Sequence, residues 1–70
     1  MKQVNSIMAG IVLEILVKPG DAISDGQDVV ILESMKMQLP VPSSEVGTVS
    51  EVKVAAGDFV NEGDVLMVLN

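Results

Sequence analysis

The residues with the clearest chemical potential lie in "LESMKMQL", residues 32–39, where one lysine stands between two methionines. The chain of 70 residues has only four cationic side chains, and all four are lysines. An ammonium group is costly to bury without a partner, and the residues around Lys36 are mostly apolar. Lys36 is therefore expected to extend into solvent.

The rest of the composition excludes several kinds of site. There is no cysteine for a disulfide, a thiolate metal site or a nucleophile, and no histidine to act as general base or metal ligand. The net charge of −6 gives no electrostatic basis for binding nucleic acid. No apolar run is long enough to span a membrane, and the first ten residues lack a secretory signal pattern. A cytoplasmic protein that binds neither membrane nor nucleic acid is expected.

An internal repeat organises the chain. Residues 9–32 align without gaps on residues 46–69 at an offset of 37, with eight identities in 24 positions. The identical pairs are Gly10/Gly47, Val12/Val49, Glu14/Glu51, Val17/Val54, Gly20/Gly57, Asp21/Asp58, Gly26/Gly63 and Leu32/Leu69. We interpret residues 1–70 as a single domain made of two similar halves.

Each half is predicted to run strand, turn, short strand, turn, strand, because valine and isoleucine dominate its apolar runs and Gly-Asp or Asp-Gly pairs separate them. Neither half can close a core alone, so the two should pack face to face as a small sandwich or flattened barrel with approximate two-fold symmetry. The turn glycines, which are expected to adopt positive φ and match no phosphate-binding loop, are Gly20, Gly26, Gly57 and Gly63.

The repeat also places the lysine. Residues 33–45 join the two aligned segments. A strand over residues 29–33 and another over residues 38–41 would make "SMKM" the tip of a hairpin within residues 33–42, with Lys36 projecting into water. Tight hairpins prefer Asn-Gly or Asp-Gly, so methionine and lysine are poor turn formers here. Something other than turn stability is expected to have selected them.

Taken one at a time, these residues have ordinary interpretations. Most lysines are solvated surface charges, methionines such as Met35 and Met37 usually fill gaps in a core, and Glu33 would usually be a solvated carboxylate. A lysine between two methionines at a turn between the halves fits neither a core nor a plain surface well.

The motif resembles a known one. "ESMKM" is similar to the biotin-attachment motif of biotinyl domains, most often Glu-Ala-Met-Lys-Met. The resemblance extends to "MAGIV", "VKPGDAISDGQ", "GTVSEV" and "AAGDFVNEGDVL", and so covers nearly the whole chain. It implies an all-β flattened barrel (a barrel-sandwich hybrid) of two four-stranded antiparallel sheets with quasi-two-fold symmetry.

By this resemblance Lys36 is the attachment site, whose amine would attack biotinyl-AMP on a biotin protein ligase to form an amide. Met35, Met37, Glu33 and Ser34 would form the flanking recognition motif, and Glu33 could contribute to ligase docking. The covalent biotin would accept a carboxyl group at a biotin carboxylase and deliver it at a carboxyltransferase. The protein would be a monomeric carrier that catalyses nothing itself and binds no metal.

Two alternatives remain open. Lipoyl domains share the fold and typically have Asp before the lysine and Ala after it, so the methionines favour biotin. Ser34 in place of the usual Ala is similar to small stand-alone biotin/lipoyl attachment proteins, which keeps lipoate as a second cofactor candidate. The second alternative is an unmodified barrel-sandwich domain that only packs against partners. Of the other lysines, Lys2 is expected in a frayed terminus, and the remaining two fall within the repeats.

Overall fold

Residues 2–70 are described by a computed structural model and form eight strands without a helix. The strands are β1 (Lys2–Asn5), β2 (Gly10–Ile15), β3 (Ala22–Ile23), β4 (Asp28–Ser34), β5 (Met37–Pro42), β6 (Gly47–Val52), β7 (Phe59–Val60) and β8 (Val65–Leu69). Over these residues there is accordingly no helix that could cross a membrane.

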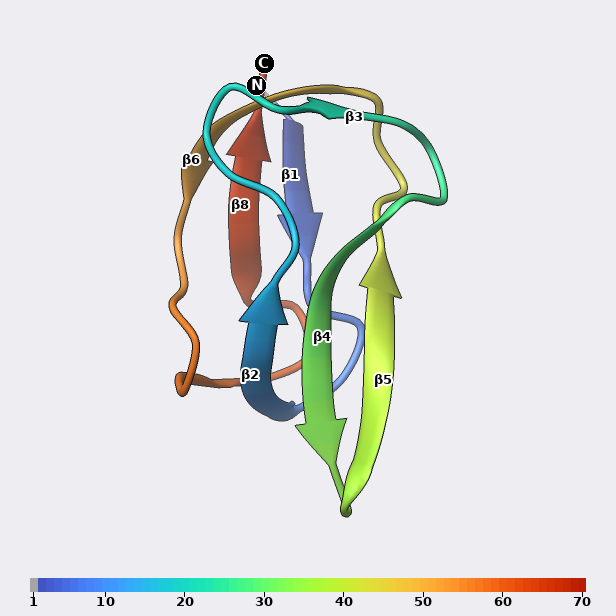
Figure 1. Cartoon of the computed structure of the whole chain (residues 1–70), viewed down its shortest axis with the longest axis vertical. Coiled ribbons are helices and arrows are strands. Elements are labelled where there is room, and N and C mark those ends of the chain that lie inside the picture. The colour runs from blue at the N-terminus through green and yellow to red at the C-terminus, as the bar shows by residue number, and fades with distance from the viewer. Residues whose placement is uncertain (1) are drawn as a thin grey trace.

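The strands form two four-stranded antiparallel sheets that face each other (Figure 1). One sheet has the order β1-β8-β6-β3 and the other β5-β4-β2-β7. An offset of 37 residues carries β2 onto β6, β3 onto β7 and β4 onto β8, and it also brings β1 into register with the second half of β5. The predicted fold class, an all-β flattened barrel of two related sheets, is confirmed.

Hydrogen bonds between the halves repeat at the same offset. The N–H of Gly20 donates to the carbonyl of Val49 at 2.8 Å, and the N–H of Gly57 donates to the carbonyl of Val12 at 2.7 Å. Each half therefore satisfies backbone groups of the other, as expected for two halves that share one core.

The structural repeat extends beyond the segments that align well in sequence. Ser6 and Ser43 are both buried, and each hydroxyl donates to the carbonyl two residues later, that of Met8 at 2.6 Å and that of Glu45 at 2.7 Å. Burying a hydroxyl is tolerated here because these bonds satisfy it. Matching serines thus shape the chain just before β2 and just before β6.

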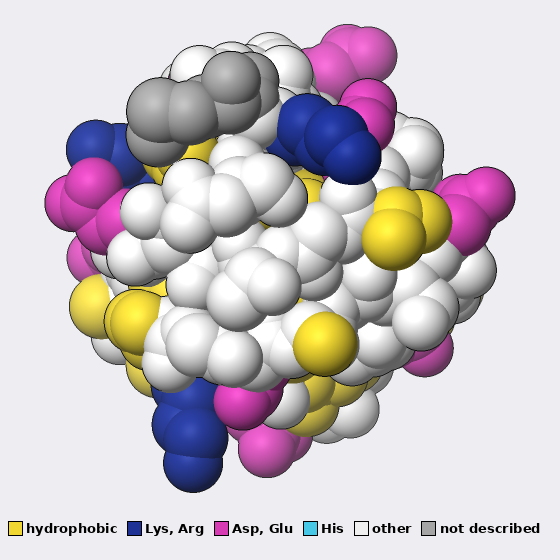
Figure 2. Space-filling model, turned by 90° about the horizontal axis from the view of Figure 1, so that it is seen from above, with side chains coloured by type: hydrophobic (Ala, Val, Ile, Leu, Met, Phe, Trp, Pro, Cys, Tyr) yellow, Lys and Arg dark blue, Asp and Glu magenta, His cyan; other side chains and the backbone are white. Residues whose placement is uncertain are grey.

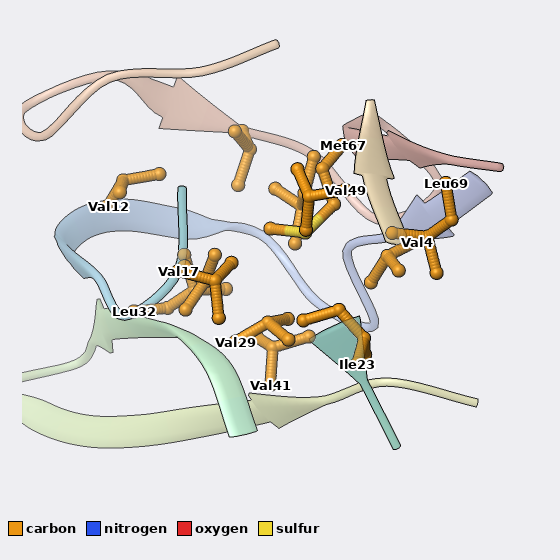
Figure 3. Packing of buried hydrophobic residues seen from close by; sticks show 13 residues of the cluster. Val4, Val12, Val17, Ile23, Val29, Leu32, Val41, Val49, Met67 and Leu69 are labelled. Atoms are coloured by element: carbon orange, nitrogen blue, oxygen red, sulfur yellow. The ribbon is translucent and has the colours of Figure 1, made fainter. Parts of the chain in front are cut away.

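Seen from the end that carries the termini, acidic side chains lie around the rim and hydrophobic side chains form separate islands (Figure 2). The hydrophobic core lies between the two sheets, where side chains such as Val29 and Val49 point inward from opposite layers (Figure 3). Its buried members are Val4, Val12, Val17, Ile23, Val29, Val30, Leu32, Val41, Val49, Val60, Leu66, Met67 and Leu69.

The turn glycines are confirmed at positive φ, with values of 97° at Gly20 and 96° at Gly57. In the first of these turns the N–H of Asp21 donates to the carbonyl of Lys18 at 3.0 Å, and the Asp21 carboxylate accepts the N–H of Lys18 at 3.0 Å. A glycine at the third position of such a β-turn suits type II geometry. These glycines therefore serve the turns, as the sequence predicts.

Two further glycines serve close packing instead. A Cβ atom on Gly10 would lie 2.8 Å from the carbonyl oxygen of Glu33, and one on Gly47 would collide with the carbonyl oxygen of Asn70. Gly10 is the first residue of β2 and Gly47 the first residue of β6, and each lies close to the backbone at the end of the neighbouring strand. Their identity in the repeat therefore reflects backbone approach.

Candidate functional site: the β4–β5 hairpin

The predicted lysine lies at the tip of a long hairpin. β4 and β5 pair from Asp28 opposite Pro42 to Ser34 opposite Met37, which leaves a loop of only Met35 and Lys36. Both loop residues have positive φ, 54° and 66°. Successive positive φ values are typical of a type I′ turn, whose twist matches that of the flanking strands. The predicted four-residue tip was too long, because strand pairing continues through Ser34 and Met37.

This turn is built from residues that disfavour it. Left-handed backbone costs a residue with a Cβ atom about 1 kcal/mol or more, and neither Met35 nor Lys36 has the short polar side chain that eases this cost. Six paired positions of β4 and β5 hold the turn in place. The hairpin therefore holds the backbone of Lys36 in the left-handed conformation.

The side chains at the tip are open to solvent. Met35 is 91% exposed and Met37 is 60% exposed, whereas Met67 in the core is fully buried. The ordinary interpretation of the two flanking methionines as gap-filling core residues is therefore wrong. Lys36 is also exposed, as predicted, and its ammonium group has no hydrogen bond or ion pair with any residue from 2 to 70.

The tip stands at one end of the molecule. The Cα trace measures 32 × 19 × 18 Å, and the hairpin points along the long axis away from both termini (Figure 1). A partner could therefore reach Lys36 without contacting the chain ends.

The other lysines have different surroundings. Lys2 lies in β1, and its ammonium donates to the carbonyl of Val46 at 2.6 Å, so the expectation that it frays is wrong. Lys53 pairs with Glu51 at 3.1 Å. Lys18 begins a β-turn beyond the end of β2.

The remaining residues of the predicted motif are placed by the strand register. Glu33 is exposed and lies between Ile11 of β2 and Gln38 of β5, while Ser34 is half-buried. Sequence reasoning missed Phe59, which is 63% exposed and pairs with Ile11 on the same sheet. The sequence marks it as the only aromatic residue in the chain, but does not show on which face of the sheet it lies.

Comparison with known proteins agrees with this geometry. A family model described as "Biotin-requiring enzyme" matches residues 2–69. The chain belongs to this biotin/lipoyl family. It is 56% identical over 63 residues to the biotin/lipoyl attachment protein of Bacillus subtilis, covering 90% of this chain and 86% of that protein.

The family includes domains of much larger proteins. The chain is 47% identical over 64 residues to the mitochondrial propionyl-CoA carboxylase alpha chain of Homo sapiens, which covers 91% of this chain and 9% of that one. It is 42% identical over 60 residues to the dihydrolipoyllysine-residue acetyltransferase component of the Pseudomonas aeruginosa pyruvate dehydrogenase complex, covering 86% and 11%. A crystal structure of Kluyveromyces lactis urea carboxylase superposes with a TM-score of 0.89 at 28% identity, covering 99% of this chain and 6% of that one.

The site fits a group carried on the lysine. Among the described residues nothing binds the amine of Lys36 at the tip, and the exposed flanking methionines do not enclose it. An open depression lies at the end of β2 that is far from the hairpin tip, and it is lined by Ile15, Leu16, Val17, Lys18 and Asp21. A group bound to Lys36 would thus extend into solvent, where a second protein could receive it.

Proposed function

We propose that this protein is a biotin carrier in which a biotin protein ligase attaches biotin to Lys36. The observation that carries the proposal is the exposed amine of Lys36, without a partner among residues 2–70, on a type I′ turn between two exposed methionines. The similarity to carboxylase domains supports biotin as the carried group. When bound, biotin would supply the chemistry of carboxyl transfer between a biotin carboxylase and a carboxyltransferase.

The part played by the chain is limited and specific. The neutral amine of Lys36 would attack the carboxyl carbon of biotinyl-AMP and form an amide. The bond from that carbon to the phosphate oxygen would break, AMP would leave, and the amine proton would pass to solvent. The hairpin supplies position, and the exposed site supplies access. With neither histidine nor cysteine in the sequence, we infer that activation and carboxylation belong to partner enzymes. We also propose that the protein is a cytoplasmic monomer between docking events.

Lipoate is the second candidate. The similarity to an acetyltransferase component with a dihydrolipoyllysine residue favours it, as does the name of the Bacillus subtilis relative. Intact mass of protein from the native host distinguishes a biotinyl group from a lipoyl group, and a streptavidin blot reports biotin alone. An unmodified protein would contradict both candidates.

We expect Lys36→Arg to abolish modification, because arginine keeps the positive charge but lacks an amine that can be acylated. The measurement is streptavidin binding and intact mass after coexpression with a biotin protein ligase. Lys53→Arg is the matched control. It should be modified normally, because it retains Lys36 and changes only a lysine that pairs with Glu51. Streptavidin binding by the Lys36 variant would show that the site assignment is wrong.

A further inference from the structure

A row of exposed side chains crosses the outer face of the sheet that carries the hairpin. Gln38 of β5 lies opposite Glu33 of β4, Glu33 opposite Ile11 of β2, and Ile11 opposite Phe59 of β7. All four are exposed, in contrast to the neighbouring buried row of Leu32 and Val12. Successive residues of a strand point to opposite faces, so these four share the outer face. We call them the outer row.

The outer row contains an unusual apolar pair. Phe59, the only aromatic residue in the chain, is 63% exposed, and its cross-strand neighbour Ile11 is 43% exposed. Aromatic side chains bury the largest apolar areas, so a small domain gains most by placing its single phenylalanine in the core. Here the core is filled by aliphatic side chains and methionine.

The internal symmetry supplies a control for this observation. The offset of 37 residues carries the pair Ile11 and Phe59 onto Thr48 and Ala22, which also lie opposite each other and are also exposed. The buried position next to Ile11 is valine in both halves, Val12 and Val49. The fold thus specifies the inner residues and leaves the outer ones free. The apolar pair occurs only in the sheet that carries the hairpin of Lys36.

Charge around the outer row defines the chemistry of a partner. Glu33 lies within the row, Glu14 is exposed further along β2, and Asp58 directly precedes Phe59. The sole ion pair among residues 2–70 is between Lys53 and Glu51, so these carboxylates are not neutralised by a lysine of the described chain. A matching surface would offer an apolar pocket bordered by lysine or arginine.

We propose that the apolar pair of Phe59 and Ile11 extends the surface by which the biotin protein ligase holds this protein, filling an apolar pocket beyond Glu33, whose part in ligase docking the motif already implies. This inference rests on the proposed function. Glu33 precedes Lys36 by three residues on the same hairpin, and the strand register continues the row from Glu33 across β2 to β7. The row therefore begins beside the lysine that the ligase must reach. Ligase contact would then depend on a whole sheet face in addition to the motif.

The test exchanges the two symmetry-related pairs. Ile11→Thr with Phe59→Ala installs the residues that the equivalent strands already accept, so the fold should tolerate them. With purified ligase, biotin and ATP, we expect the KM for this protein to rise roughly tenfold while kcat stays within about twofold, as for loss of an apolar anchor. The control carries Thr48→Ile with Ala22→Phe and should match the wild type.

A binding measurement separates docking from chemistry. Lys36→Arg protein should inhibit the ligase competitively, and adding Ile11→Thr with Phe59→Ala should raise its inhibition constant by a similar factor. If that pair unfolds the domain, Glu33→Gln replaces it and should raise the KM and weaken its dependence on salt.

The outcomes separate the two ideas. If wild-type protein is never biotinylated, the proposed function fails. If it is biotinylated and the exchanged pair leaves the KM and the inhibition constant unchanged, the docking inference alone is overturned. The inference is also overturned if the pair alters only carboxylation of the biotinylated protein, or if sedimentation shows that it instead dissolves a dimer of this chain.

Discussion

At the scale of single residues, the position of the lysine should matter as much as its presence. Met35 and Lys36 are consecutive in a type I′ turn, so their side chains leave the hairpin in different directions. Exchanging the two, as Met35→Lys with Lys36→Met, should reduce the initial rate of biotinylation to background while the unfolding temperature changes little. The measurement is a ligase time course, and equal rates for the two proteins would contradict the requirement for position.

Residue patterns predicted the exposed lysine but not its exposed neighbours. An unpaired charge beside apolar residues has one inexpensive location, which is solvent, whereas a methionine can be placed either in a core or on a surface. Phe59 was harder to predict, because β7 has only two residues and offers no alternation to show which face each takes. The comparison of equivalent positions in the two halves distinguishes it, and that comparison needs the strand register.

At the scale of elements, the tight turns should limit stability. Gly57→Val places a β-branched residue at a φ of 96°, where a Cβ would meet no atom within 4 Å, so any cost comes from the backbone alone. We expect the free energy of unfolding in urea to fall by roughly 1 to 3 kcal/mol, a large share for a small domain. Gly57→Asn should lose less, because asparagine adopts positive φ more readily. Wild-type stability of the valine variant would show that the turn relaxes without strain.

The elements themselves were largely predictable from the repeat, and the details of the hairpin were not. Gly-Asp turns and runs of valine and isoleucine place most strands correctly. The turn at Met35 and Lys36 has no such local signal, and its two-residue length follows from pairing of Ser34 with Met37 across β4 and β5. Similarly, the sequence did not predict that the hydroxyls of Ser6 and Ser43 would be buried and bonded to nearby carbonyl groups. Tertiary pairing sets both features.

At the scale of the whole molecule, the two-fold arrangement separates attachment from connection. The hairpin tip and the chain ends lie at opposite ends of the long axis (Figure 1). The pair of strands related to β4 and β5 is β8 and β1, whose outer ends are Leu69 and Lys2, opposite each other. One half of the repeat thus ends in the turn that presents Lys36, and the equivalent place in the other half is occupied by the termini. The same domain could therefore operate alone or as part of a longer chain, as its relatives do.

Under the proposed function, net charge should set how fast this protein meets its partner enzymes. The chain carries −6, and acylation of Lys36 removes one positive charge more. If the partner carboxylase is basic around its active site, kcat/KM for carboxylation of the biotinylated protein should fall several-fold between about 20 and about 300 mM NaCl as screening shortens the range of attraction, while kcat stays constant. An uncharged biotin amide is the control substrate and should show little dependence on salt. Parallel salt curves for the two substrates would mean that the charge of the domain has no part in docking.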